Sequence, residues 1–226
     1  MGHDKELHNS HVRESSMYVP ESFAISDAQA IALIRACPLG ALVTQGASGL
    51  DANHVPFELD VAANGKSVLR AHVARNNPVW QEVGNGAEVL VIFRAADAYI
   101  SPNWYPSKHE LHRQVPTWNY MVVHAHGTIT IHDDERYVRG VVARLTRTHE
   151  ASQPKPWKMT DSAPDFIDER LKAIVGIEVQ VTRLVGKHKL SQNRDRLDRE
   201  SAAHAVKSQG GEILGDAMLA CPRQAD

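Results

Sequence analysis

Residues 71–80, AHVARNNPVW, combine a cation with the start of a helix. The apolar run before Arg75 is expected to be a strand, and Asn76 or Asn77 then caps a helix with Pro78 in its first turn. This arrangement brings a guanidinium group and free backbone N–H groups to one place, which suits a phosphate. A plain strand-to-helix turn with a surface arginine fits the same residues equally well.

Aromatic side chains gather on a proline-rich stretch in the middle of the chain. Residues 99–106 read YISPNWYP, and residues 115–120 read VPTWNY. Trp and Tyr beside Ser, Thr and Asn can enclose a flat aromatic ligand and hydrogen-bond to its edges. The alternative is a loop that folds over one end of the domain and buries its aromatic residues in the core.

A dense group of hydrogen-bond donors follows the last strand-like run. Residues 187–194 read KHKLSQNR and suit an anion or the polar edge of a ring. Residues 186–200 contain five Lys or Arg and three acidic residues, so their net charge is five minus three, or +2. A solvated charged tail and a contact with nucleic acid are the alternatives.

The chain is rich in histidine, with 13 in 226 residues. His124 and His126 share one face of an expected strand, as two metal ligands would. A third ligand at motif spacing is missing, so a packed pair is favoured and no metal is expected. The sequence contains no P-loop, G-x-S-x-G, HExxH or CxxC motif.

The overall composition is that of an ordinary globular domain. The 25 basic and 27 acidic residues leave a net charge of −2, which gives no support to a polyanionic partner. No apolar run approaches the roughly 18 residues of a membrane span, and no export signal precedes the first expected helix. Cys37 and Cys221 are too far apart in sequence for a zinc motif. We therefore expect a cytoplasmic protein with no membrane partner.

Six strand-like runs with helices between and after them predict an α+β fold that is mainly β. Their spacing favours a small closed or split barrel over a doubly wound parallel sheet, because no GxGxxG follows the first strand. Residues 101–117 are expected to be a loop. The expected strands are 41–44, 54–59, 68–74, 88–93, 117–131 and 174–184, and the expected helices are 27–37, 77–83, 134–148 and 164–171.

Taken in order, these motifs resemble the PaiB family, whose members are described as FMN-binding negative transcriptional regulators. The resemblance implies a six-stranded split β-barrel, related to pyridoxamine-phosphate oxidase, that forms homodimers with FMN at the interface. Residues 1–16 would be a disordered arm, 17–194 the FMN-binding domain and 195–226 a polar, partly helical extension. The segments that carry the resemblance are MYVP (17–20), AHVARNNPVW (71–80), YISPNWYPSK (99–108), VPTWNY (115–120), VVHAHG (122–127) and KLSQNR (189–194).

The resemblance and the residue patterns together indicate which side chains meet FMN. No catalytic residue is predicted, because flavin chemistry belongs to the cofactor. The expected binding residues are Arg75 and Asn76 at the phosphate; Lys189, Ser191 and Gln192 as further donors to the phosphate, ribityl chain or ring edge; Ser101, Thr117, Trp118 and Asn119 around the isoalloxazine; and His54 and His72 facing the cleft.

Two other functions fit the same sequence. The piperazate synthases resemble this family, bind haem in the related cleft and form an N–N bond. Haem b would need an axial imidazole, and His72 is the residue expected to supply it. The other alternative is a DNA-binding regulator without a redox role, although the sequence contains no recognisable DNA-reading element.

Overall fold

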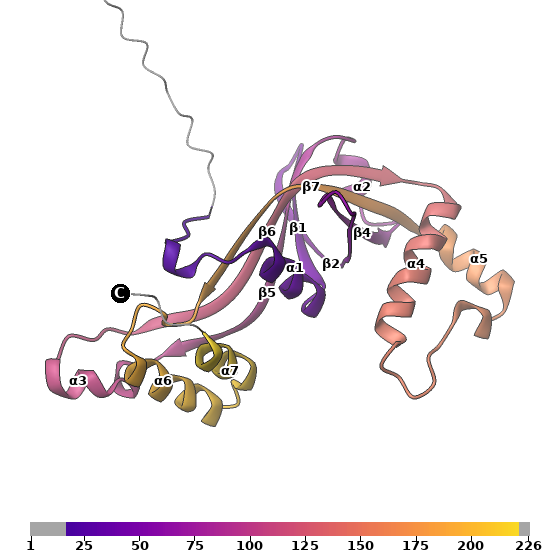
Figure 1. Ribbon diagram of the computed structural model, residues 1–226. Helices are drawn as coiled ribbons and strands as arrows, with labels where there is room; N and C mark the ends of the chain where they lie inside the picture. Colours follow the sequence, from indigo (N-terminus) through magenta and orange to yellow (C-terminus); the bar gives the residue numbers. More distant parts are fainter. Residues whose placement is uncertain (1–16, 222–226) are drawn as a thin grey trace, which may run out of the picture.

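The computed structural model describes residues 17–221 (Figure 1). The predicted disordered arm, residues 1–16, and the end of the predicted extension, residues 222–226, lie outside the described range. The strands form one antiparallel sheet in the order β2-β1-β5-β6-β7-β4-β3. Their bounds are β1 (Leu39–Gly46), β2 (Gly49–Pro56), β3 (Glu58–Val61), β4 (Ser67–Ala74), β5 (Glu88–Ile100), β6 (Thr117–His132) and β7 (Ile174–Lys189).

The predicted count of six strands is wrong, because the described sheet contains seven. The expected strand at residues 54–59 is divided at Phe57, the single residue between β2, which ends at Pro56, and β3, which begins at Glu58. Phe57 donates its N–H to the carbonyl of Pro38 at 2.9 Å instead of to a sheet neighbour. The chain then resumes as β3 on the opposite edge of the sheet from β2.

The sheet curls toward a barrel without closing. Cα atoms of β2 and β4 approach within 8 Å, but the two strands form no ladder. The side chain of Asn77, just after β4, donates to that of Asn53 on β2 at 2.6 Å. An α+β split barrel is therefore observed, as predicted, with one more strand than predicted.

The core lies on the inner face of this sheet, and α1 (Asp27–Ala36) covers part of it. A capping box between Ser26 and Gln29 starts α1, and its buried residues include Ile34. Gly186 of β7 leaves room for the residues that lead into α1, since a Cβ there would lie 2.3 Å from Cγ1 of Ile25. The other helices are α2 (Val79–Glu82), α3 (Pro106–Leu111), α4 (Glu135–Glu150), α5 (Pro164–Lys172), α6 (Arg196–Ser208) and α7 (Glu212–Ala220).

The segment 101–117 is more regular than the predicted loop. It contains the short 3-10 helix η2 (Pro102–Trp104) and helix α3. Each of the two begins with a proline, whose fixed φ suits the first position of a helix. The prolines that favoured a loop therefore start two short helices.

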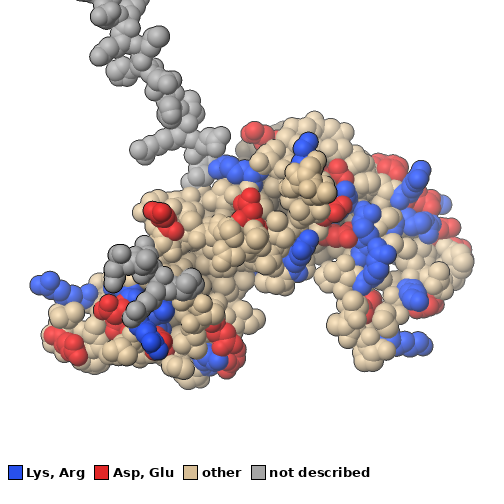
Figure 2. Space-filling model, in the orientation of Figure 1, with Lys and Arg blue, Asp and Glu red and all other residues tan. Residues whose placement is uncertain are grey.

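Strands β6 and β7, of 16 residues each, connect the two ends of the molecule. At about 3.3 Å per residue each strand is about 50 Å long. Helices α4 and α5 lie at one end of this pair and α3, α6 and α7 at the other (Figure 1). The space-filling view shows a hollow between the two ends (Figure 2). No described helix is both long and apolar enough to cross a membrane.

Candidate functional site

The predicted site residues divide into two main groups at opposite ends of β6 and β7. His72 and Arg75 lie near Ile174, where β7 begins, whereas Thr117 and Lys189 lie where β6 begins and β7 ends. Because the strands between them are about 50 Å long, one protomer cannot bring Arg75 and Lys189 to the same phosphate.

Arg75 is engaged in internal contacts. Its guanidinium forms two hydrogen bonds with the carboxylate of Asp133, at 2.5 and 3.0 Å, and donates to the carbonyl of Lys172 at 2.7 Å. The hydrogen bonds to Asp133 raise the pKa of Arg75, and the same bonds lower the pKa of Asp133. Asn76 is exposed beside it, and the side chain of Asn77 accepts from the N–H of Val79. Arg75 thus ties β4 to the start of β7 and the end of β6.

The two predicted cleft histidines lie on different strands of the sheet. His54 is exposed on the edge strand β2, opposite Ala41. His72 pairs with Gly176, and a Cβ at Gly176 would lie 2.6 Å from the Tyr137 ring of α4. His72 is therefore on the face that α4 covers. Its Nδ1 is buried without a hydrogen-bond partner among the described residues, and burial lowers its pKa.

Three of the predicted residues are covered by the C-terminal helices. The amide of Asn119 donates to Oγ of Ser191 at 2.9 Å and contacts Sδ of Met218 on α7, and both polar residues are buried. Ser191 has a left-handed φ of 65°, so the chain turns sharply after β7. Gln192 donates to the carbonyl of His188 at 2.5 Å. These groups hold the junction between β7, α6 and α7 together.

Ser101 has a local role in the described structure. Its hydroxyl accepts a hydrogen bond from the N–H of Asn103 at 3.2 Å and caps η2. This bond fixes the start of the aromatic segment that follows β5.

The neighbouring part of the sheet presents exposed aromatic side chains. Trp118 of β6 and Tyr99 of β5 are opposite each other, with ring centroids 6.2 Å apart in an edge-to-face arrangement. They are 53% and 46% exposed, which is unusual for large aromatic residues on a sheet. Tyr120, two residues further along β6, pairs with Lys189 of β7. Since side chains alternate along a strand, Trp118, Tyr120 and Lys189 share one face.

Lys187, Lys189 and Arg194 form what we call the cation cluster. Nζ of Lys187 donates to the carbonyl of Tyr18 at 3.0 Å, Nζ of Lys189 donates to Oγ1 of Thr117, and Arg194 lies 5.4 Å from the Tyr105 ring. None of the three has an acidic partner among residues 17–221. Burial, together with the charges of Lys187 and Arg194, lowers the pKa of Lys189. Three cations without a counter-charge are suited to an anion.

Sequence reasoning missed part of this arrangement. Lys187, Arg194, Tyr99 and Tyr120 were not among the expected binding residues, although they lie within or beside the quoted motifs. Lys187 and Lys189 alternate along β7 and so share one face, but the predicted strand ended at residue 184 and left both outside it.

The family model described as "Putative FMN-binding domain" matches residues 17–183. The chain belongs to this family. Its match covers β1–β6 and most of β7, and it ends before the cation cluster and before α6 and α7. The cation cluster therefore lies beyond the matched residues, whereas Tyr99 and Trp118 lie within them.

Two relatives are similar to this chain in sequence. An uncharacterized protein of Emericella nidulans is 32% identical over 213 residues, covering 79% of this chain and 85% of the relative. The protease synthase and sporulation protein PAI 2 of Bacillus subtilis is 29% identical over 183 residues, covering 80% and 85% of the two chains. The second relative confirms the predicted resemblance to the PaiB family.

A solved structure supports the fold. The FAD and heme binding protein from Mycobacterium smegmatis superposes with a TM-score of 0.50 at 17% identity, covering 75% of this chain and 74% of that one. At this identity the likeness concerns the fold alone, and it agrees with the predicted split barrel.

Proposed function

We propose that this protein binds FMN, with the phosphate at the cation cluster and the isoalloxazine beside Trp118 and Tyr99. The observation that carries the proposal is that three cations with no acidic partner among residues 17–221 lie at the same end of the sheet as two exposed aromatic rings. A flavin mononucleotide joins a dianionic phosphate to a flat aromatic ring, so both halves of the site have a matching partner. The family match supports a flavin as the ligand.

The residues of the site would each contribute to binding. Lys189 and Arg194 would neutralise the phosphate, and the hydroxyl of Thr117, already bonded to Lys189, would orient the ammonium group. Trp118 would exclude water from one edge of the ring. Bound FMN would supply hydride or electron transfer, so the chain would act as a redox regulator or as an oxidoreductase.

A second copy of the chain would complete the site. The outward face of the sheet carries a row of partly buried apolar residues, in which Val43, Leu90 and Ile92 lie on adjacent strands with His124 and His126. An apolar row of this kind is typical of a homodimer interface. Within one copy, Arg75 is too far from Lys189 to reach the same ligand. In a dimer, Arg75 of the second copy would approach the ligand of the first. A dimer would therefore bring both predicted groups of binding residues to one site.

The test is the absorbance spectrum of the purified protein, followed by titration with FMN. We expect flavin bands near those of free FMN and quenching of flavin fluorescence on binding. Lys189→Gln should weaken FMN binding about tenfold, because a charge-assisted hydrogen bond contributes about 1.5–3 kcal/mol. Lys66→Gln, at an exposed turn between β3 and β4, is the matched control and should bind as wild type. Equal affinities of all three proteins would reject this site.

The same spectrum tests haem b as the alternative cofactor. The Mycobacterium smegmatis protein of similar fold is named for FAD and heme, which supports haem as the alternative. Haem ligation by His72 requires α4 to move away, because the Tyr137 ring covers the neighbouring Gly176. A Soret band in the purified protein that disappears in His72→Ala would show that the cofactor is haem ligated by His72 and not FMN.

A regulatory role rests on similarity to the Bacillus PAI 2 protein. The basic stretch after residue 186 offers limited support for direct DNA binding, since Arg196 pairs with Glu200 and Arg199 is buried. A gel-shift assay at two salt concentrations tests it, because phosphate contacts weaken steeply as salt rises. A salt-sensitive shift supports a regulator, whereas no shift favours an oxidoreductase.

A further inference from the structure

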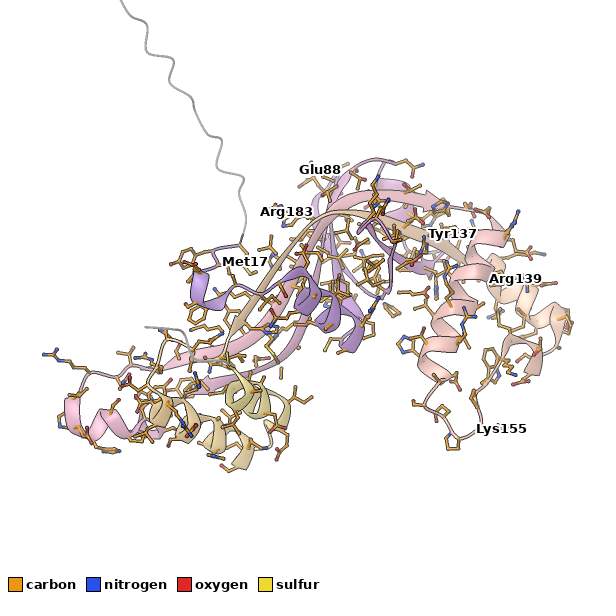
Figure 3. All side chains as sticks on the ribbon, in the orientation of Figure 1. Met17, Glu88, Tyr137, Arg139, Lys155 and Arg183 are labelled. Carbon is orange, nitrogen blue, oxygen red and sulfur yellow. The ribbon has the colours of Figure 1, made fainter. Side chains whose placement is uncertain are left out.

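A cavity of about 470 Å³ lies between the second half of α4 and the segment 151–160 that follows it. Its volume falls within the roughly 300–1,000 Å³ of pockets that bind small molecules. Lys155 marks the tip of this segment in Figure 3, at the end of the molecule that is distant from the cation cluster. The cavity is therefore separate from the proposed FMN site.

The amino-acid sequence of α4 produces one wall of the cavity. Ala143, Thr146, Arg147 and Glu150 are spaced at i, i+3, i+4 and i+7, so they share one face of the helix. The small side chains of Ala143 and Thr146 leave space where larger residues would pack against the returning segment. The cavity is thus a consequence of side-chain size on this face.

The segment after α4 forms the opposite wall. Pro156 restricts the backbone, and the N–H of Trp157 donates to Oε2 of Glu150 at 2.9 Å. This bond keeps the indole beside the cavity, where it is 40% exposed. Met159 lies behind it and packs on the small core formed by α4 and α5. The cavity therefore presents an aromatic face and a thioether to a ligand.

The rim of the cavity is positively charged. Arg147 and Lys158 border it, and neither forms an ion pair within residues 17–221. The acidic residue on the rim, Glu150, already accepts the Trp157 N–H. Figure 2 shows basic side chains standing out from this end of the molecule, with acidic ones among them. An apolar cavity with cations at its edge is complementary to an apolar anion.

We propose that this cavity binds a small aromatic carboxylate. The ring would lie between Trp157 and the short side chains of α4, where stacking and burial of apolar surface stabilise it. The carboxylate would point outward to the guanidinium of Arg147, which can donate two parallel hydrogen bonds. Lys158 would add a second positive charge.

The test uses 1-naphthylacetate and its uncharged analogue 1-naphthylacetamide as probes, with the full chain and isothermal titration. We expect 1-naphthylacetate to bind saturably and at least fivefold more tightly than the amide. Trp157→Ala should weaken binding of both probes about tenfold, whereas Arg147→Gln should weaken the carboxylate alone. Trp157→Phe should retain most of the affinity, because it keeps an aromatic ring.

Arg136→Gln is the control, since Arg136 is on α4 but does not border the cavity. FMN affinity should be the same in Trp157→Ala as in wild type, which separates this proposal from the proposed function. Circular dichroism should show that each variant is folded. No saturable binding to wild type, or Trp157→Ala binding as wild type does, would overturn the proposal.

Discussion

Arg75 joins three strands through side-chain contacts at one end of the sheet. It follows β4, pairs with Asp133 after β6 and donates to carbonyl groups of Lys172 and Ile174 at the start of β7. A guanidinium suits this position because it offers five donors in a fixed plane. A lysine would satisfy fewer of these acceptors.

Arg75→Ala is expected to lower the midpoint of thermal unfolding at pH 7. The hydrogen bonds to Arg75 lower the pKa of Asp133 below its usual value near 4, so the pair stabilises the fold above that pH. The stabilisation is lost as the pH falls through the lowered pKa. Thermal unfolding at pH 7 and pH 3 measures this, and the difference from wild type should be smaller at pH 3. Arg35→Ala, on the exposed side of α1, should change neither value.

Three partly buried histidines predict a loss of stability in mild acid. Burial lowers the pKa values of His72, His124 and His188, whereas in the unfolded chain these groups have pKa values near 6.5. Below pH 6.5 the unfolded chain binds protons that the folded chain does not. Each histidine then reduces the free energy of unfolding by up to about 1.4 kcal/mol per pH unit. Urea unfolding at pH 7.5 and 5.5 should show this loss, and His72→Gln should reduce it. An unchanged loss in His72→Gln would contradict the assignment.

At the scale of elements, α6 positions the helical segment that follows β5. The carboxylate of Asp198 is buried and accepts from the N–H and hydroxyl of Ser107, at 3.0 and 2.5 Å, and from Nε2 of Gln114 at 3.2 Å. These bonds hold the start of α3 and the segment that follows it against α6. Since α6 lies beyond the residues that the family model matches, the C-terminal part of this chain orders a segment within the matched part.

Asp198→Ala should therefore loosen α3 more than it loosens the sheet. Losing hydrogen bonds to a buried carboxylate is expected to cost about 2–3 kcal/mol of unfolding free energy. Hydrogen–deuterium exchange should become faster over residues 106–114 and remain slow in β6. Asp195→Ala, on the exposed residue before α6, is the control. Exchange over α3 that stays as slow as in wild type would contradict this role.

Local patterns predicted most of the elements. Ser26 and Asp134 act as N-caps, and the long apolar runs became β5, β6 and β7. The alternating run at residues 54–59 supplies parts of both edge strands, β2 and β3. Periodicity could not show this, because the break between the two strands depends on the contact between Phe57 and Pro38. The predicted strands were too short, because residues beyond each apolar run also pair with the neighbouring strand.

The candidate site was less accessible to sequence reasoning. Arg75 and Lys189 were both predicted to bind the ligand, but Asp133, 58 positions after Arg75, neutralises only Arg75. Asn119 and Ser191 are polar residues in apparent ligand motifs, yet they bond to each other beneath α7. Such pairings between distant positions leave no local signal in a single sequence.

At the scale of the whole molecule, the outward apolar row predicts self-association. Ile92 lies in the middle of this row, between Ala41 on β1 and His124 on β6. Ile92→Glu places a charge there and should convert a dimer into a monomer, as measured by light scattering after gel filtration. Phe166→Glu, an exposed apolar residue of α5, should leave the mass unchanged. A dimeric mass for Ile92→Glu would contradict the proposed interface.

The single residue between β2 and β3 has a consequence for how copies of the chain could exchange parts. Both edge strands have unpaired backbone groups, and an exposed edge invites pairing with another chain. Here Phe57 alone connects the two edges, and its buried ring packs edge-to-face on Phe93, 5.9 Å away. So short a linker keeps the two edges of one molecule together. A longer insertion at this position would free them for strand exchange between molecules, so domain-swapped oligomers and aggregates are the expected failure of such a variant.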